Sequence, residues 1–176
     1  QKSPARFDRE RLTWMNGVMI RALPLDELLQ RSQNFWPADG AASSLDYRLE
    51  VLRLVQDRLK FLAELPELTD FFFIDPQPNP ELLSKHFGAT AAAGHLEAVL
   101  AALPDDWTEP MLEAAIRPLA EQRGVKTGQL FGLLRSALTG RTAAPGLFET
   151  MAVLGDTTTR RRLATAHAVL AKPSSR

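Results

Sequence analysis

The chain has 176 residues, of which 45% are apolar and 24% charged, values typical of a folded globular protein rather than a disordered one. Its 21 basic and 21 acidic residues cancel, so the basic excess usual in a self-sufficient nucleic-acid binder is absent and any such affinity must come from local patches. Cysteine is absent, which excludes disulfides and thiolate metal sites, and no apolar run approaches the roughly 20 residues that cross a bilayer.

The first predicted helix begins near Asp8. A carboxylate there is a suitable N-cap, because it can accept hydrogen bonds from the first unpaired backbone N–H groups of a helix. Leu12, Met15 and Met19 follow at near-helical spacing. They are therefore expected to form the buried face of this helix.

Two further helices are predicted before residue 66. The first covers residues 24–34, because proline is tolerated in a first turn and three leucines then share one face. A loop over residues 38–44 leads to the second, a long helix over residues 45–65 with a strongly basic outer face. Salt bridges at helical spacing are the preferred explanation for Arg48 and Arg53 on that face.

A proline-rich segment predicts the domain boundary. Three prolines in five residues make a stiff connector without a helix. The aromatic run before it, residues 71–73, is more typical of a core or an inter-domain contact than of a platform for stacking bases. The predicted parts are a first domain over residues 1–75, the connector 76–80, a second domain over residues 81–172 and a frayed tail over residues 173–176.

The second domain is also predicted to be helical. Apolar spacing indicates helices over residues 89–103 and 109–122, the latter with Thr108 as N-cap and Pro118 as a kink. The last helix follows Gly155 and carries three consecutive arginines. These arginines are equally consistent with contacts to a phosphate backbone and with a solvated helix face, and both alternatives stay open.

Residues 126–155 form the most distinctive stretch. Four leucines build one apolar stripe on a helix that closes at Gly140, where glycine supplies left-handed dihedral angles. A short polar loop follows, and Pro145 then opens a second apolar helix. The turn brings unpaired N–H groups together with Arg135 and Arg141, a combination that suits an oxyanion, a phosphate or a base edge. Residue chemistry alone equally allows plain loop punctuation and solvated arginines.

Enzymatic signals are missing from the sequence. It contains no Walker loop, nucleophile elbow, dinucleotide-binding glycine fingerprint or His-Glu-x-x-His motif. The three histidines lie in different predicted elements without carboxylates at ligand spacing. We therefore predict no catalytic residue, no metal site and no cofactor site in this chain.

The stretch LRSALTGRTAAPGLFETMAVLG, residues 134–155, resembles the C-terminal motif of bacterial glutamyl-tRNA synthetases, which are class I aminoacyl-tRNA synthetases. In that motif a leucine–arginine helix, a Thr-Gly turn, a Pro-Gly-Leu-Phe helix start and a closing Leu-Gly recur in this order. A second block, Phe7-Asp8 with LTWMNG at residues 12–17 and Ile20-Arg21, resembles the segment that follows the catalytic part of the same enzymes. The resemblance covers residues 4–171.

This resemblance implies an all-α fold of two small helical-bundle subdomains in tandem. It implies a monomeric cytoplasmic protein without a membrane contact, whose partners are the anticodon loop of tRNA-Glu and a catalytic domain of the same enzyme. ATP and magnesium would belong to that enzyme. Since this chain lacks the HIGH-like and KMSKS-like ATP motifs of class I synthetases, it is not expected to aminoacylate on its own.

The resemblance also implies roles for single residues. Arg135 and Leu147 would meet the first anticodon base, and Ala144 with Pro145 the second. Arg58 would read the third base and separate glutamate from glutamine tRNAs, with Arg53 or Lys60 as alternatives one register step away. Possible phosphate contacts are Arg141, Arg160, Arg161 and Arg162.

One residue departs from the family pattern. The family often has Ser or Thr before the Pro-Gly-Leu-Phe block, where this chain has Ala144, so a hydroxyl contact to the second base is lost and only backbone groups remain. The alternative function, favoured by the zero net charge, is a helical protein-interaction module without an RNA role.

Overall fold

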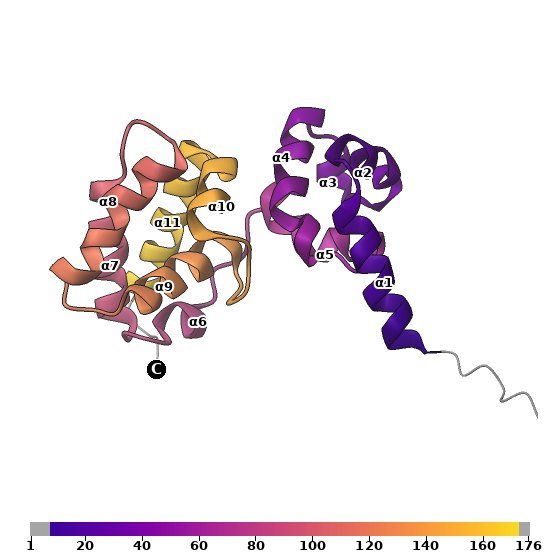
Figure 1. The fold of residues 1–176 in the computed structure, drawn as a ribbon. Coiled ribbons are helices and arrows are strands. Elements are labelled where there is room, and N and C mark those ends of the chain that lie inside the picture. Colours follow the sequence, from indigo (N-terminus) through magenta and orange to yellow (C-terminus); the bar gives the residue numbers. More distant parts are fainter. Residues whose placement is uncertain (1–7, 173–176) are drawn as a thin grey trace, which may run out of the picture. The chain divides into compact units, whose positions relative to one another are not determined.

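The computed structural model describes residues 8–172. Within them the chain forms eleven α-helices and three short 3-10 turns, and no strand occurs in this range (Figure 1). The all-α prediction is therefore confirmed. The chain divides between Phe73 and Ile74 into two compact units, which we call unit 1 and unit 2.

Unit 1 contains five α-helices and the three 3-10 turns. In chain order they are α1 (Arg9–Ala22), α2 (Leu25–Arg31), η1 (Gln33–Phe35), α3 (Ala38–Ala41), α4 (Leu45–Val55), η2 (Gln56–Arg58), η3 (Leu62–Glu64) and α5 (Leu65–Phe73).

Helix α1 begins as predicted but buries a different face. Asp8 caps it by accepting a hydrogen bond from the Arg11 amide at 3.0 Å. The prediction that Leu12, Met15 and Met19 are buried is wrong, because these side chains are 41–65% exposed. The buried residues of α1 are Gly17 and Ile20, which lie on the side of the helix that packs against η2.

The predicted single helix over residues 45–65 is wrong too. Helix α4 ends at Val55 and passes into η2, and Leu59 is extended. The Gln56 side chain donates hydrogen bonds to the carbonyl oxygens of Ile20 and Leu23 at the end of α1. This tertiary contact lies where the helix breaks, although the apolar periodicity continues through it.

Other predictions for unit 1 have mixed outcomes. The loop predicted over residues 38–44 contains the short helix α3. Arg53 forms the expected ion pair with Glu50, 3.3 Å apart, whereas the Arg48 guanidinium lies over the Trp36 ring. The aromatic run belongs to α5, where Phe71 and Phe72 are buried, so the interpretation as core is confirmed for these two.

Unit 2 contains six α-helices. They are α6 (Pro80–Ser84), α7 (Ala89–Ala102), α8 (Glu109–Gln122), α9 (Thr127–Thr139), α10 (Leu147–Leu154) and α11 (Asp156–Ala171). Helix α11 packs along α7 and also contacts α6, α9 and α10, so it is the central helix of this unit. Pro80 starts α6, with the Asn79 side chain accepting from the first amides of that helix.

A buried arginine connects three segments of unit 2. Arg162 on α11 is only 5% exposed. Its Nη1 donates to the carbonyl oxygen of Leu138 at 2.7 Å, its Nε donates to Asp75 at 2.9 Å and its Nη2 donates to the carbonyl oxygen of Ile74 at 3.3 Å. The single guanidinium therefore fastens the end of α9 and the segment before α6 to α11.

Asp75 has a second partner in the neighbouring Arg161, which donates to both carboxylate oxygens at 2.8 and 3.0 Å. The hydrogen bond from Arg161 lowers the pKa of Asp75, and Arg162 adds to this effect against the opposing influence of burial. Because the side chains of Asp75 and Arg161 are both about half exposed, this outer pair is a surface salt bridge of modest value.

We expect Arg162→Met to lower the free energy of unfolding by about 3 kcal/mol, because it leaves two backbone carbonyls and part of a carboxylate without their donor. Arg161→Met is the matched control on the same acceptor and should cost less than about 1 kcal/mol. Urea denaturation followed by circular dichroism measures both. Equal losses would show that Arg162 does not fasten these segments.

A histidine is buried on α7. His95 is 6% exposed, and its Nδ1 accepts a hydrogen bond from Arg123 Nε at 2.7 Å. The Phe87 ring packs against it with 4.4 Å between ring centroids. Burial lowers the pKa of His95, and the Arg123 charge lowers it further. The neutral imidazole is thus the form that the folded protein accommodates.

This arrangement predicts a pH dependence of stability. With a folded pKa below its usual value of 6.5, His95 contributes stability that is fully present above about pH 6.5 and is lost as the pH falls through the lower, folded pKa. His95→Asn keeps an acceptor near the Nδ1 position but cannot be protonated. We expect the wild type to lose more free energy of unfolding than His95→Asn between pH 7.5 and 5.5, and parallel losses would contradict this.

Candidate functional site

The turn between α9 and α10, residues 140–146, is the centre of the predicted site. Gly140 has φ +69° and closes α9 in the left-handed conformation, with its amide donating to the Ser136 carbonyl oxygen at 2.9 Å. The Thr139 hydroxyl donates to the Arg135 carbonyl oxygen and accepts from the Arg141 amide. These short-range bonds define the direction in which the chain leaves the helix, and the predicted helix end at Gly140 is confirmed.

The turn also rests on the segment before α6. A Cβ atom at Gly140 would lie 3.0 Å from the Cβ of Pro76, so the backbone approaches the proline closely. Pro76 directly follows Asp75, which Arg162 holds together with the Leu138 carbonyl two residues before the turn. The Arg162 guanidinium therefore holds both the end of α9 that leads into the turn and the segment on which the turn rests.

Three residues predicted to meet anticodon bases are buried. Ala144 and Leu147 are 8% and 6% exposed, and Pro145 is buried between them. Below the turn, the Phe148 ring meets the Phe131 ring edge-on with 5.2 Å between centroids, which joins α10 to α9. The side chains of Ala144, Pro145 and Leu147 thus support the turn, and a ligand can reach mainly its exposed residues, which include Thr142, Ala143 and Gly146.

The start of α10 already carries a negative charge. A Cβ atom at Gly146 would lie 1.8 Å from Oε2 of Glu149, which shows that this carboxylate folds back over the first turn of the helix. A carboxylate there is favoured by the positive end of the helix dipole. Glu149 was not among the predicted site residues, although an acidic residue three positions after an N-cap is a recognisable capping signal.

Arg135 is the partly exposed guanidinium on α9 nearest this turn in sequence. Arg135 as a whole is half-buried. Its Nε atom is fully buried and has no hydrogen-bond acceptor among residues 8–172. A buried donor of this kind costs free energy until an acceptor arrives. Arg135 is thus a predicted site residue that keeps an unsatisfied buried donor in the absence of a ligand.

The predicted phosphate contacts separate into different classes. Arg141 is half-buried within the turn. Arg160 is paired with Asp156 and lies over the Trp107 ring, 5.8 Å from its centroid, while Arg161 is paired with Asp75. Arg162 is removed from the set of phosphate contacts, because its guanidinium is enclosed and bonded inside unit 2.

Arg58 lies in unit 1. It is exposed and ends the 3-10 turn η2, rather than lying within a long helix as the sequence suggested. Of the two alternatives, Arg53 is held by Glu50 on α4, and Lys60 is exposed beyond the buried Leu59.

Neither a metal-ligand cluster nor a membrane-spanning helix occurs among the described residues. Among residues 8–172, no three His, Cys, Asp or Glu side chains come close enough together to hold a metal ion. Within the same range, none of the helices combines the length and the apolar character that a membrane span requires.

Comparison with known families gives a direct match. Residues 27–167 match the family model described as the anticodon binding domain. This range includes all of α4 to α10 and therefore the whole turn at residues 140–146, together with Arg58 and Arg135.

Individual relatives agree with this match. The chain is 43% identical to the glutamate–tRNA ligase of Roseiflexus castenholzii over 185 residues, which covers 97% of this chain and 36% of the relative. It is 41% identical to the glutamate–tRNA ligase of Herpetosiphon aurantiacus, with 96% and 36% covered. The chain thus spans about a third of the length of these relatives.

A solved structure has the same fold. A glutamate tRNA ligase from Elizabethkingia meningosepticum superposes with a TM-score of 0.86 over 97% of this chain and 34% of its own. At 23% sequence identity this similarity concerns the fold.

The close approach of the turn to Pro76 can be tested with two glycines. Gly140 and Gly124 have φ angles of +69° and +66°, but no described atom lies within 4 Å of a Cβ atom at Gly124. Gly124→Ala should cost about 1 kcal/mol from backbone strain, and Gly140→Ala about 1 kcal/mol more because its new methyl group meets the proline. Thermal or urea unfolding measures the difference, and equal costs would mean that the turn does not rest on Pro76.

Proposed function

Because the chain belongs to the anticodon-binding domain family, we propose that it is the tRNA-reading part of a glutamate–tRNA ligase. In this proposal it holds the anticodon loop of tRNA-Glu in the cytoplasm, while a catalytic domain of the same enzyme acts on the acceptor end. The observation that carries the proposal is the family match over residues 27–167, supported by 43% identity to a glutamate–tRNA ligase over nearly the whole chain. ATP and magnesium would be bound by the rest of the enzyme.

Arg135 is the proposed reader of the first anticodon base. A guanidinium is a donor-only group, so it suits the acceptor atoms of a base edge. Its half-buried position on α9 restricts the side chain before RNA arrives, and its Nε has no acceptor among the described residues. Donation from this guanidinium to an acceptor atom on the base edge would make the contact specific.

The turn itself is proposed to meet the first and second bases through its backbone. The side chains of Ala144, Pro145 and Leu147 are buried and support the turn. Their peptide groups are therefore the parts proposed to face the RNA. Because Glu149 already covers the start of α10, a base is a better ligand there than a second negative charge.

Arg58 is the proposed reader of the third base. It is exposed on a 3-10 turn whose neighbours Val55 and Leu59 are buried, so the backbone that carries it is anchored. Donor-only chemistry suits the acceptor atoms of a cytosine and is less suited to the donor groups of a guanine.

Arg141, Arg160 and Arg161 are the proposed contacts to phosphate. They would add affinity that does not depend on sequence and falls as salt rises. With zero net charge, the chain depends on such local groups. The zero charge also favours the alternative, a helical protein-interaction module without RNA binding.

We expect the chain to bind an anticodon stem-loop of tRNA-Glu in a gel-shift assay, more weakly at moderate than at low salt, and to prefer it over a tRNA-Gln stem-loop. Arg58→Gln should reduce that preference by about 1–3 kcal/mol, or roughly 5- to 150-fold, because one base contact is lost. Overall affinity should change much less.

The matched control is Arg53→Gln, which removes a nearby exposed arginine that is paired with Glu50. It should leave the preference unchanged. An equal loss on both stem-loops after Arg58→Gln would remove that residue from base reading. No binding of either stem-loop at low salt would favour the protein-interaction alternative.

A further inference from the structure

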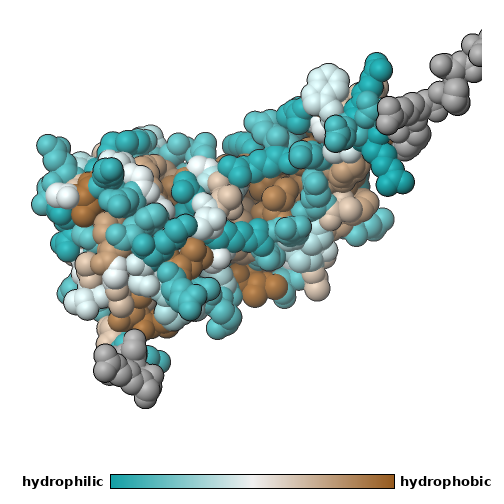
Figure 2. All heavy atoms as spheres, turned by 90° about the horizontal axis from the view of Figure 1, so that it is seen from below, coloured by the Kyte–Doolittle hydropathy of each residue, from teal (hydrophilic) through white to brown (hydrophobic). Residues whose placement is uncertain are grey.

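Exposed apolar side chains are concentrated on and beside α1. Nine large apolar side chains are exposed among residues 8–172, and six of them lie on α1 or on the loop beside it. These six are Leu12, Trp14, Met15, Val18, Met19 and Phe61. Figure 2 shows tan and brown surface beside the grey N-terminal trace, where α1 lies. Single exposed apolar residues need no explanation, but a cluster on one helix does.

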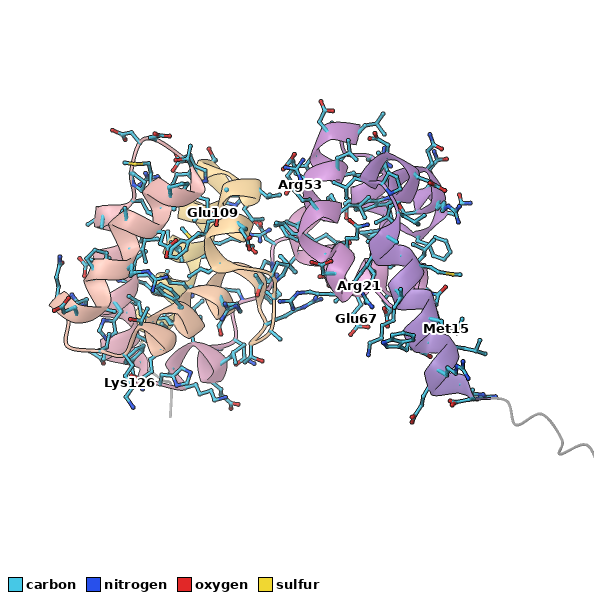
Figure 3. The ribbon with its side chains drawn as sticks, viewed as in Figure 1. Met15, Arg21, Arg53, Glu67, Glu109 and Lys126 are labelled. Atoms are coloured by element: carbon cyan, nitrogen blue, oxygen red, sulfur yellow. The ribbon has the colours of Figure 1, made fainter. Side chains whose placement is uncertain are left out.

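Part of this cluster forms a groove. Leu12, Met15 and Met19 follow one flank of α1 at spacings of three and four residues, and Phe61 faces them from the loop after η2. The groove has a volume of about 530 Å³ and is edged by three more polar residues, Arg9, Thr13 and Asn16. Figure 3 shows Met15 projecting away from the helices of unit 1.

The groove is formed in advance. Asn16 donates a hydrogen bond to the Lys60 carbonyl oxygen, which ties the loop to α1. The Glu64 carboxylate accepts from the amides of Lys60 and Phe61 at 2.7 and 3.1 Å, so Phe61 is held in its exposed position. The loop therefore does not need to refold to receive a partner.

Rotating α1 cannot hide these side chains. The opposite side of the helix is already used, since Gly17 and Ile20 are buried and a Cβ atom at Gly17 would lie 3.5 Å from the Leu59 carbonyl oxygen. Helix α1 thus carries apolar residues both on its buried side and on the side of the groove, as expected of a helix that is covered on more than one side.

We propose that the α1 groove is the docking surface for the remaining part of the ligase, the approximately two-thirds of the enzyme that this chain does not span. The inference rests on the proposed function, because it takes a glutamate–tRNA ligase as the parent protein. The chain covers 36% of its curated relative and 34% of the solved ligase with the same fold, so in both proteins this fold is joined to a larger partner in the same polypeptide.

The chemistry of the groove favours protein over RNA. Among the seven residues that line the groove, Arg9 is the one cation and four have large apolar side chains. An apolar protein surface would remove these side chains from water at about 25 cal/mol per Å², whereas a phosphate backbone would gain a single charge contact and leave them wet.

Methionine oxidation tests the proposal, because oxidation by peroxide follows exposure of the thioether. Met15 and Met19 lie in the groove, and Met111 in unit 2 is an internal control of comparable exposure, 44% against 41% for Met15. The experiment compares the isolated 176-residue chain with a chimera in which it replaces the matching third of the Roseiflexus castenholzii ligase. Mass spectrometry follows each methionine, and no RNA is present.

We expect all three methionines to oxidise readily in the isolated chain. In the chimera, Met15 and Met19 should oxidise at least about tenfold more slowly, with Met111 unchanged. Met19→Glu in the chimera should restore the oxidation of Met15, because the charge opposes docking. Since RNA is absent, the result does not depend on whether the anticodon loop binds. Failure of the docking proposal can therefore be distinguished from failure of the proposed tRNA binding, which the gel-shift assay tests.

Three outcomes would overturn the inference. Oxidation of Met15 and Met19 at the rate of Met111 in the chimera would show that the groove stays open. Protection of both residues already in the isolated chain, with a dimer in sedimentation that Met19→Glu dissociates, would assign the groove to a second copy of this chain. Continued protection of Met15 in the chimera after Met19→Glu would show that the groove does not form the contact with the rest of the ligase.

Discussion

The enclosed guanidinium of Arg162 is the interaction on which unit 2 depends. It reaches the last turn of α9, the carboxylate of Asp75 and the backbone of Ile74 from one position on α11. A planar group with several fixed donors can join three segments, which a lysine ammonium cannot do with the same geometry. Because Pro76 follows Asp75 and lies against Gly140, this joint also determines where the turn between α9 and α10 lies.

Because the Arg162 interactions hold the turn in place, the residues of the predicted site have different tasks. Side chains that the family motif places at the bases are largely buried here, so they hold a backbone shape rather than offering polar groups. In the proposed function, base reading by side chains falls to Arg135 in unit 2 and, separately, to Arg58 in unit 1. Single arginines of this kind can supply local donors in a chain of zero net charge.

In unit 1, helix α1 has one side packed against the rest of the unit and another side that is apolar and exposed. The inward side of α1 is closed by Gly17, Ile20 and the Gln56 contacts, and its outward side carries apolar side chains beside a loop that Asn16 and Glu64 hold in place. A cluster of exposed apolar side chains of this kind is typical of an interaction surface. The residues proposed to read the anticodon and those proposed to form the docking surface are therefore separate groups within the chain.

Local patterns are sufficient to predict the helical class, the cap at Asp8, the end of α9 at Gly140 and the family motif, because these depend on local propensity and on the order of a few residues. Long-range packing, in contrast, sets which side of α1 is buried, where α4 stops and which of three consecutive arginines is internal. Periodicity shows that a helix has an apolar face but not which neighbour covers it, and α1 has apolar residues on more than one face. The break after Val55 coincides with hydrogen bonds from Gln56 to residues more than thirty positions away, and Arg162 differs from Arg160 and Arg161 because its side of α11 faces the carbonyl oxygens of Leu138 and Ile74. Contacts between distant segments are absent from any local pattern, which is why these features could not be predicted.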